Sequence, residues 1–161
     1  MLIVIDDVLC DKDVLAVQNC FASDEARAMR WITGNYTEAL QHTSPLTQLL
    51  AIAGQYFSLR DMDGVECWAH LGTYPGWHVD RDEALAETTG EITHPICSIV
   101  YYGNIDGLVG GAFRTETEVI TPKTNRMLMF SPGLLHSVDN YTGTRLSVAV
   151  NPWVKKPLGY T

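Results

Sequence analysis

From Gly64 onward the chain consists of short runs rich in Val, Ile, Tyr, Trp and Thr, separated by Gly, Pro and Asn. These runs read VECWAHLGTY, ICSIVYYGN, GAFRTE, TEVITP, RMLMFSP, LLHSV and TRLSVAVNPW. β-Branched and aromatic residues favour extended backbone, and the residues between the runs favour tight turns. Many short strands at this spacing predict a β-sandwich or a barrel.

The first third of the chain has a different pattern, which indicates helices. Residues 2–9 are mostly aliphatic and predict one short strand. In residues 11–33 the apolar side chains are spaced as in one or two amphipathic helices, which Asp11 or Ser23 could cap. A third helix is expected to begin at Ser44, ahead of a proline at the first helical position, and to run through PLTQLLAIAGQYFS.

The helical and strand-rich parts are not separated by a linker or a change in composition. A chain of 161 residues also has the size of one domain. We therefore expect a mainly β protein with N-terminal helices, of the α+β class, in a single domain over residues 1–161. Helices at about 10–60 would brace one face of a curled sheet at about 64–154.

Charge and composition narrow the possible partners and compartments. The formal net charge of −8 argues against a nucleic-acid partner, because phosphate binding requires a basic surface. The N-terminal stretch MLIVIDDVLC has no basic start and is too short to span a bilayer, which predicts a cytoplasmic protein without a membrane partner. The four cysteines form no CxxC pair, which predicts free thiols in a reducing compartment.

The polar segment RDEALAETTGEITH, residues 81–94, interrupts the strand pattern. A loop of this length in a compact domain is typical of a lid or a binding loop. Its acidic residues could favour a basic peptide or an amine as ligand, although a solvated loop explains them at least as well. These residues are Asp82, Glu83, Glu87 and Glu91.

Residues 77–80 read WHVD, which places His78 and Asp80 two positions apart. Such a pair also arises by chance, so alone it is weak support for a metal site. On an extended strand the two side chains would lie on one face, about 6.6 Å apart, and could bind one ion. Two histidines and one carboxylate suit Fe(II) and leave three positions open for other ligands. A second histidine is then expected from a neighbouring strand.

His136 is the candidate for that second histidine. It follows an apolar strand and a Ser-Pro-Gly turn in FSPGLLHSV, which would bring it from the sheet to the mouth of a barrel. The other three histidines are better explained as surface residues or as hydrogen-bonded core residues. They are His42, His70 and His94.

Arg145 is the candidate for binding an anion. It opens the apolar strand RLSVAVNPW, where a buried guanidinium would be costly unless it were paired with a carboxylate. Because side chains alternate along a strand, Ser147 lies on the same face and could bind the same anion. The alternative is an arginine that reaches solvent at the end of the strand.

The ordered set HVD, CSIVYYGN, GGAFR, NRMLMF and a histidine followed nine residues later by an arginine resembles the Fe(II)- and 2-oxoglutarate-dependent dioxygenases. It is most similar to their prolyl 4-hydroxylase branch, which includes the hypoxia-factor prolyl hydroxylases. The similarity covers roughly residues 60–154. It implies a double-stranded β-helix, or jelly roll, braced by helices, with an iron triad of His78, Asp80 and His136.

The resemblance also implies a site for the co-substrate 2-oxoglutarate. Arg145 matches the basic residue that pairs with the distal carboxylate, and Tyr102 matches a tyrosine that hydrogen-bonds the same group. Arg145 and Ser147 together are similar to the RxS signature of other members. Tyr74 and Trp77 precede the triad and are expected to form part of the substrate pocket wall.

The reaction implied by the resemblance is hydroxylation of a C–H bond by O2, with release of succinate and CO2. Ascorbate is a candidate accessory reductant. A prolyl residue of a peptide or protein is one candidate substrate, and small molecules are another, because these motifs report the cofactor and not the substrate. Two other classes of protein remain: a non-catalytic ligand-binding jelly roll and a cupin-like metalloprotein, which has no general need for Arg145.

Overall fold

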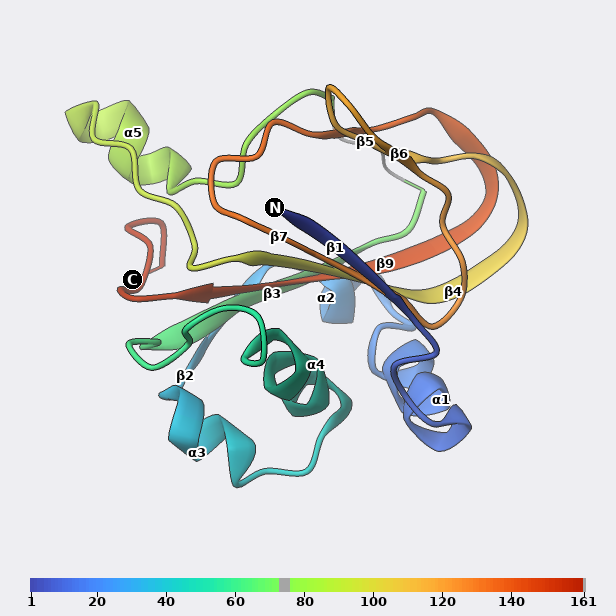
Figure 1. Ribbon diagram of the computed structural model, residues 1–161, viewed down its shortest axis with the longest axis horizontal. Coiled ribbons are helices and arrows are strands. Elements are labelled where there is room, and N and C mark those ends of the chain that lie inside the picture. Colours follow the sequence, from blue (N-terminus) through green and yellow to red (C-terminus); the bar gives the residue numbers. More distant parts are fainter. Residues whose placement is uncertain (73–75, 161) are drawn as a thin grey trace.

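The computed structural model describes residues 1–72 and 76–160 (Figure 1). Its strands are β1 (Leu2–Asp6), β2 (Arg30–Thr33), β3 (Gly64–His70), β4 (Ser98–Gly110), β5 (Phe113–Arg114), β6 (Val119–Ile120), β7 (Arg126–Phe130), β8 (Ser137–Val138) and β9 (Tyr141–Trp153). Its helices are α1 (Asp11–Cys20), α2 (Asp24–Arg27), α3 (Tyr36–Leu40), α4 (Pro45–Ala53) and α5 (Glu83–Thr89).

Within the described residues the strands form two antiparallel sheets. The larger has six strands in the order β1, β7, β4, β9, β3, β2, and the smaller has three in the order β6, β5, β8. Strands β5 and β6 lie above the large sheet in Figure 1, and helices α1 and α4 lie below it. The large sheet is therefore the middle layer, with helices on one face and the small sheet on the other.

Alternate residues of the central strands pack on opposite faces of the large sheet. In β4, Ile99 and Tyr101 belong to the core on the helical side, whereas Val100 and Tyr102 pack in the core between the sheets. The same alternation in β7 places Met129 toward the helices and Phe130 toward the small sheet. This period of two is the one expected for strands with both faces covered.

The face of β3 and β9 that lies between the sheets is more polar than the helical face. Three cross-strand pairs stand side by side on it: Glu66 with Asn151, Trp68 with Ala149, and His70 with Ser147. Arg145 extends this row by two residues along β9, because residues two apart share a face. This row forms one wall of the candidate site.

The helix expected after Ser44 is confirmed as α4. The Ser44 hydroxyl accepts a hydrogen bond from the backbone amide of Thr47, and Pro45 occupies the first turn. The helix ends at Ala53, before the end of the predicted segment. Its buried residues pack against the outer face of the large sheet.

Part of the expected helical segment 11–33 is instead a strand. Ser23 caps the short helix α2 as predicted, but α1 is preceded by Cys10, and Asp11 is its first residue. Residues 30–33 form β2, the edge strand that pairs with β3. Trp31 lies close over Gly64, where a Cβ atom would meet the indole at 2.3 Å. Cross-strand packing of this kind overrides a helical spacing of apolar residues.

Segment 81–94 is not simply a loop, because it contains helix α5. The Asp82 carboxylate accepts a hydrogen bond from the Leu85 amide at 3.0 Å, and Gly90 ends the helix with φ of +76°. In Figure 1 this helix projects from one end of the molecule.

None of the helices within residues 1–72 and 76–160 combines the length and apolar character needed to cross a bilayer.

Candidate metal centre

His78 and His136 are brought together by their own main chains. The amide of His78 donates to the carbonyl of His136 at 2.9 Å, and the amide of His136 donates to the carbonyl of His78 at 2.9 Å. His136 follows the turn after β7, as predicted. The pairing is an isolated bridge, so the strand expected around His78 and Asp80 is reduced to one residue pair.

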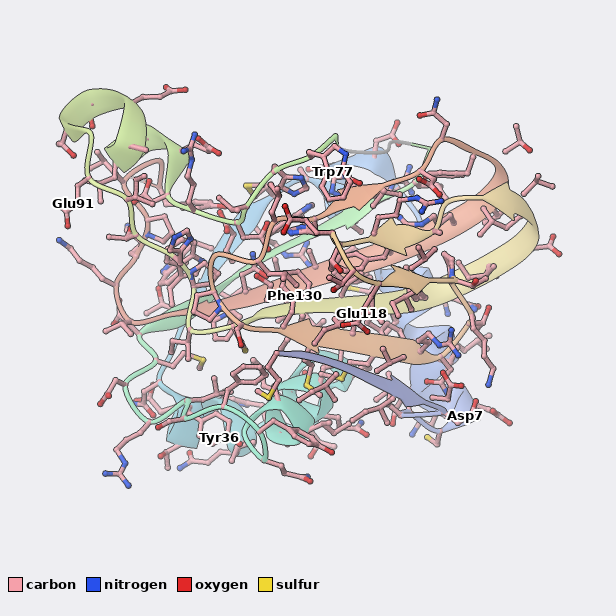
Figure 2. All side chains as sticks on the ribbon, turned by 45° about the horizontal axis from the view of Figure 1, so that its top comes forward. Asp7, Tyr36, Trp77, Glu91, Glu118 and Phe130 are labelled. Carbon is pink, nitrogen blue, oxygen red and sulfur yellow. The ribbon has the colours of Figure 1, made fainter. Side chains whose placement is uncertain are left out.

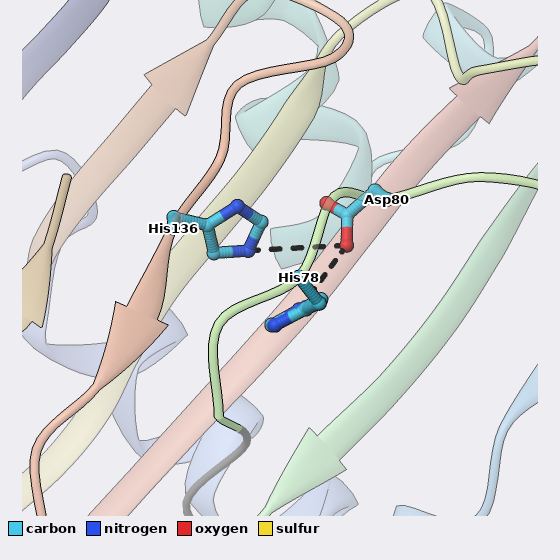
Figure 3. Close-up of side chains that lie close together, drawn as sticks. All are labelled: His78, Asp80 and His136. Atoms are coloured by element: carbon cyan, nitrogen blue, oxygen red, sulfur yellow. Dashed lines mark ion pairs between the residues drawn. The ribbon is translucent and has the colours of Figure 1, made fainter. Parts of the chain in front are cut away.

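Asp80 completes a group of three possible metal ligands (Figure 3). Its Oδ1 atom lies 3.7 Å from Nε2 of His78 and 3.9 Å from Nε2 of His136. One donor atom from each residue lies within 4.8 Å of the other two. Neighbouring ligands of an octahedral ion at about 2.1 Å are about 3 Å apart, so modest side-chain movements would bring all three to one ion.

Backbone carbonyls orient both imidazole rings. Nδ1 of His78 lies 2.7 Å from the carbonyl of Gly76, and Nδ1 of His136 lies 2.8 Å from that of Leu134. A carbonyl can only accept, so each Nδ1 carries the proton and each Nε2 keeps its lone pair for a metal. Burial lowers the pKa of His136, which keeps its ring in the neutral form that metals bind.

The His136 ring is also fixed by aromatic packing. It stacks on Phe113, with centroids 5.2 Å apart and an interplanar angle of 20°. Phe130 contacts it at 4.8 Å between centroids, and the His78 ring lies at 4.2 Å. With 5% of its surface exposed, His136 has little freedom to leave this position.

Two residues that the sequence did not single out for this role hold the segment around Asp80: His94 contacts Asp80 itself, and Asp82 anchors the chain two residues further on. Nδ1 of His94 lies 2.7 Å from the carbonyl oxygen of Asp80 and donates to it. The second carboxylate oxygen of Asp82 accepts from the Leu158 amide at 2.7 Å, which ties the segment to the C-terminal part of the chain. Neither residue belongs to a recognisable metal-binding spacing, so the sequence held no signal for them.

Arg145 is a buried cation, with 1% of its surface exposed. Its Nε donates to the Gly111 carbonyl at 3.1 Å, Nη1 to the Ser147 hydroxyl at 2.9 Å, and Nη2 to the Tyr102 hydroxyl at 3.5 Å. Its guanidinium carbon lies 5.1 Å from the ring centroid of Tyr102. No carboxylate within residues 1–72 and 76–160 forms an ion pair with Arg145. Hydrogen bonds and the Tyr102 ring hold this guanidinium in place of an ion pair with those residues.

One cavity joins the three possible metal ligands to Arg145. Its volume is about 50 Å³, and its walls include Ser147 and Asn151. Tyr102 is fully buried behind the guanidinium and does not line the cavity. The structure therefore brings together the predicted triad and the predicted anion-binding residues.

The two residues expected in the substrate pocket wall are placed differently. Trp77 is 54% exposed next to His78, at the surface (Figure 2). Trp77 lines neither this cavity nor a larger groove that shares His78 and Asp80 with it. In this position it does not form the pocket wall that the sequence predicts. Tyr74 lies outside the described residues.

Solved structures match nearly the whole chain, although no family model and no curated protein matches the sequence. A prolyl-4-hydroxylase from Pseudomonas putida has a TM-score of 0.65 and 19% identity, over 96% of this chain and 88% of that one. A 2OG-Fe(II) oxygenase family protein from Burkholderia pseudomallei has a TM-score of 0.60 and 12% identity, over 97% of this chain and 86% of that one.

A third match is a prolyl hydroxylase from Trichoplax adhaerens, solved with a peptide fragment of the hypoxia inducible factor oxygen degradation domain. It has a TM-score of 0.56 and 13% identity, over 94% of this chain and 83% of that one. At these identities the likeness shows the fold. The expected mainly β jelly roll with bracing helices, as in prolyl 4-hydroxylases and related oxygenases, is thus confirmed.

Proposed function

We propose that this protein is an Fe(II)- and 2-oxoglutarate-dependent dioxygenase that hydroxylates a C–H bond and releases succinate and CO2. One observation carries the proposal: a single cavity is lined by two imidazoles, a carboxylate and a buried guanidinium that forms no ion pair within the described residues. A ligand with a metal-binding group and a distant carboxylate fits this lining. 2-Oxoglutarate has these two features.

The chain's own residues suit Fe(II). His78 and His136 would bind it through Nε2 and Asp80 through Oδ1, because both Nδ1 atoms already donate to carbonyls. Two histidines and one carboxylate are the ligand set of non-haem Fe(II) oxygenases. When bound, the iron supplies the activation of O2. The protein would supply two imidazoles oriented through their Nδ1 atoms and one carboxylate as the ligands.

Arg145 would bind the distal carboxylate of 2-oxoglutarate. A guanidinium has five N–H donors, and three of them point to Gly111, Ser147 and Tyr102, so two remain for a carboxylate. A planar pair of donors suits a carboxylate in a bidentate arrangement. The charge is already buried, so the protein bears the desolvation cost of this cation before the co-substrate arrives.

A prolyl residue of a peptide or protein is one candidate substrate. Its support is the shared fold with prolyl hydroxylases, one of which was solved with a peptide. Small molecules and free amino acids remain alternative substrates, because the triad and the residues around Arg145 would bind the iron and the co-substrate and not the substrate.

The decisive experiment is an assay of succinate release with Fe(II), ascorbate and 2-oxoglutarate over a panel of peptides, amino acids and nucleotides. His78→Ala should abolish turnover of 2-oxoglutarate. His42→Ala is the matched control, because His42 is exposed and lies in the connector before α4. Unchanged turnover in His78→Ala would overturn the proposal. Metal binding that 2-oxoglutarate does not enhance would favour a cupin-like or non-catalytic protein.

A further inference from the structure

A groove of about 540 Å³ lies beside the metal centre and shares His78 and Asp80 with the cavity described above. Its lining comes from β3 and β9, from residues 78–84 and from part of the C-terminal segment 157–160. It is the place from which a substrate group could approach the metal ligands. The polar residues that line it therefore bear on substrate choice.

Asn151 lies where the groove and the metal cavity meet, because it lines both. It is 1% exposed, and neither its Nδ2 nor its Oδ1 has a hydrogen-bond partner among the described residues. An unpartnered buried carboxamide costs free energy, and most buried polar groups in proteins are paired. A ligand that supplies both a donor and an acceptor would remove this cost.

Glu66 stands opposite Asn151 on β3 and also lines the groove. Its carboxylate accepts a hydrogen bond from the Tyr160 hydroxyl at 2.8 Å. Burial raises the pKa of Glu66 although the hydrogen bond from Tyr160 lowers it, so a cation beside this carboxyl group would stabilise its ionised form. No lysine or arginine pairs with Glu66 in the part of the chain that the structure describes.

Glu66 therefore brings a carboxyl group to the groove that forms no ion pair within the described residues. Arg81 is the basic residue on its wall, and its guanidinium is paired with Glu83 at 2.9 Å. A metal ion would neutralise part of the charge of Asp80, but it would leave Glu66 without a cation. A positively charged ligand group is the chemistry that fits.

The acidic residues of segment 81–94 contribute less negative charge to the groove than the sequence predicts. Both oxygens of Asp82 accept backbone hydrogen bonds, and Glu83 is paired with Arg81. Glu87 and Glu91 do not line the groove, and Glu91 lies far from Trp77 at the outer part of the α5 region (Figure 2). Glu66, which the sequence did not single out, is the better candidate for recognising an amine.

We propose that this groove binds the substrate through an ammonium group, with the Glu66 carboxylate as counter-ion and the Asn151 carboxamide as hydrogen-bond partner. The ammonium donates to Glu66 and to Oδ1 of Asn151. Nδ2 of Asn151 donates to an acceptor next to the amine. The indole of Trp68, which lies between Glu66 and His70 on the same strand face, adds an aromatic surface that attracts cations.

This pattern of groups defines a substrate class. An ammonium on a carbon that also bears a carbonyl or carboxylate group occurs in free α-amino acids and at the N-terminus of a peptide. An internal prolyl residue has no such ammonium. Binding of an ammonium in this groove does not depend on the proposed function. The identification of the bound molecule as the substrate does rest on it.

The first test is binding, measured by calorimetry on the full chain with and without Mn(II) and 2-oxoglutarate. The probes are the L-amino acids, their dipeptides with a C-terminal glycine, and the N-acetylated form of each. Free-amine probes should bind at least tenfold more tightly than their acetylated forms, which have lost the charge. Tighter binding of the amino acid would indicate a free amino acid as substrate, and tighter binding of the dipeptide would indicate a peptide N-terminus.

Two variants link that binding to the groove. Glu66→Gln should weaken binding of the free-amine probe about tenfold to a hundredfold, whereas Glu87→Gln, the same change at an exposed position outside the groove, should not. Asn151→Leu keeps the number of side-chain atoms but removes the unpaired polar groups. It should raise Tm by a few degrees while it weakens binding.

Equal binding of acetylated and free-amine probes, or no binding of any free-amine probe, would overturn the inference. So would a loss of stability in Asn151→Leu without a change in binding. These results are distinct from a failure of the proposed function, in which 2-oxoglutarate would neither bind nor be turned over. Turnover of 2-oxoglutarate with an acetylated or internal prolyl substrate would leave the dioxygenase in place and remove only the ammonium site.

Discussion

The backbone amide and carbonyl of His78 are both hydrogen-bonded to those of His136, at 2.9 Å each. This pairing of the main chains places the two imidazoles side by side, with ring centroids 4.2 Å apart. Asp80 lies two residues beyond this pair and depends on other contacts for its position. In the candidate metal centre the two histidines are accordingly held by their own main chains, whereas Asp80 needs support from neighbouring residues.

His94→Ala should weaken metal binding although His94 is not itself a ligand. Its Nδ1 donates to the Asp80 carbonyl at 2.7 Å, so its removal frees the backbone that carries the carboxylate. Loss of such a supporting residue typically costs roughly 10- to 100-fold in metal affinity. Calorimetric titration with Mn(II) measures the effect, with His42→Ala as control. An affinity equal to that of the unmodified protein would contradict this role.

Arg145→Met should abolish 2-oxoglutarate binding without destabilising the protein. Buried ion pairs replaced by apolar residues of similar volume are often neutral or stabilising, by about 1–4 kcal/mol, and we expect the same direction for this buried charge. Urea unfolding measures stability, and calorimetry compares 2-oxoglutarate with 2-oxobutyrate, which lacks the distal carboxylate. The unmodified protein should prefer 2-oxoglutarate by about a hundredfold or more, and the variant should not distinguish the two. A destabilised variant that still prefers 2-oxoglutarate would refute the assignment.

Two of the four thiols should react quickly with an aromatic disulfide reagent at pH 8, and two slowly. Cys10 and Cys20 are exposed. Burial raises the pKa of Cys67 and of Cys97 to about 12, so almost none of either is thiolate, the reactive form, at that pH. Absorbance at early times should correspond to two thiols, rising to four in denaturant. Four rapid thiols would mean that the core opens readily.

Asp6→Asn should destabilise the protein at neutral pH but not in strong acid. Hydrogen bonds from Arg126, at 2.6 and 3.0 Å, lower the pKa of Asp6 to about 2 from 3.8. A lowered native pKa means that the stabilisation is complete above about pH 4 and is lost as the pH falls through about 2. Urea midpoints of the two proteins should therefore converge between pH 4 and pH 2. If the urea midpoints differed by the same amount at every pH in that range, the ion pair between Asp6 and Arg126 would not be the cause of the difference.

The strand-rich part of the fold could be predicted because each strand carries its own period of two and its own turn residues. The strand at residues 30–33 could not, because it is an edge strand whose partner lies far along the chain and whose apolar residues also fit a helix. Helix α5 could have been found from its ends. Asp82 before the helix and Gly90 after it are a common start and stop pair, but the polar composition between them suggested a loop.

Some residues of the candidate site could likewise be predicted from the sequence, and others could not. His136 and Arg145 could be picked out because a histidine after a turn and an arginine in an apolar strand are visible in the sequence. His94 acts through its position beside a carbonyl, and Asn151 is notable because its carboxamide has no hydrogen-bond partner among the described residues. Both properties depend on residues distant in the chain, so no local pattern reports them.

Arg145 and Asn151 lie on the same face of β9, six residues apart, which is about 20 Å of extended chain. β9 is hydrogen-bonded to β3 on one side and β4 on the other, so this distance is fixed. If Arg145 holds the co-substrate and Asn151 the substrate amine, the strand sets how far the oxidised carbon lies from the nitrogen. Regioselectivity would then be a property of the backbone, and a substrate longer by one methylene would be oxidised at a different carbon.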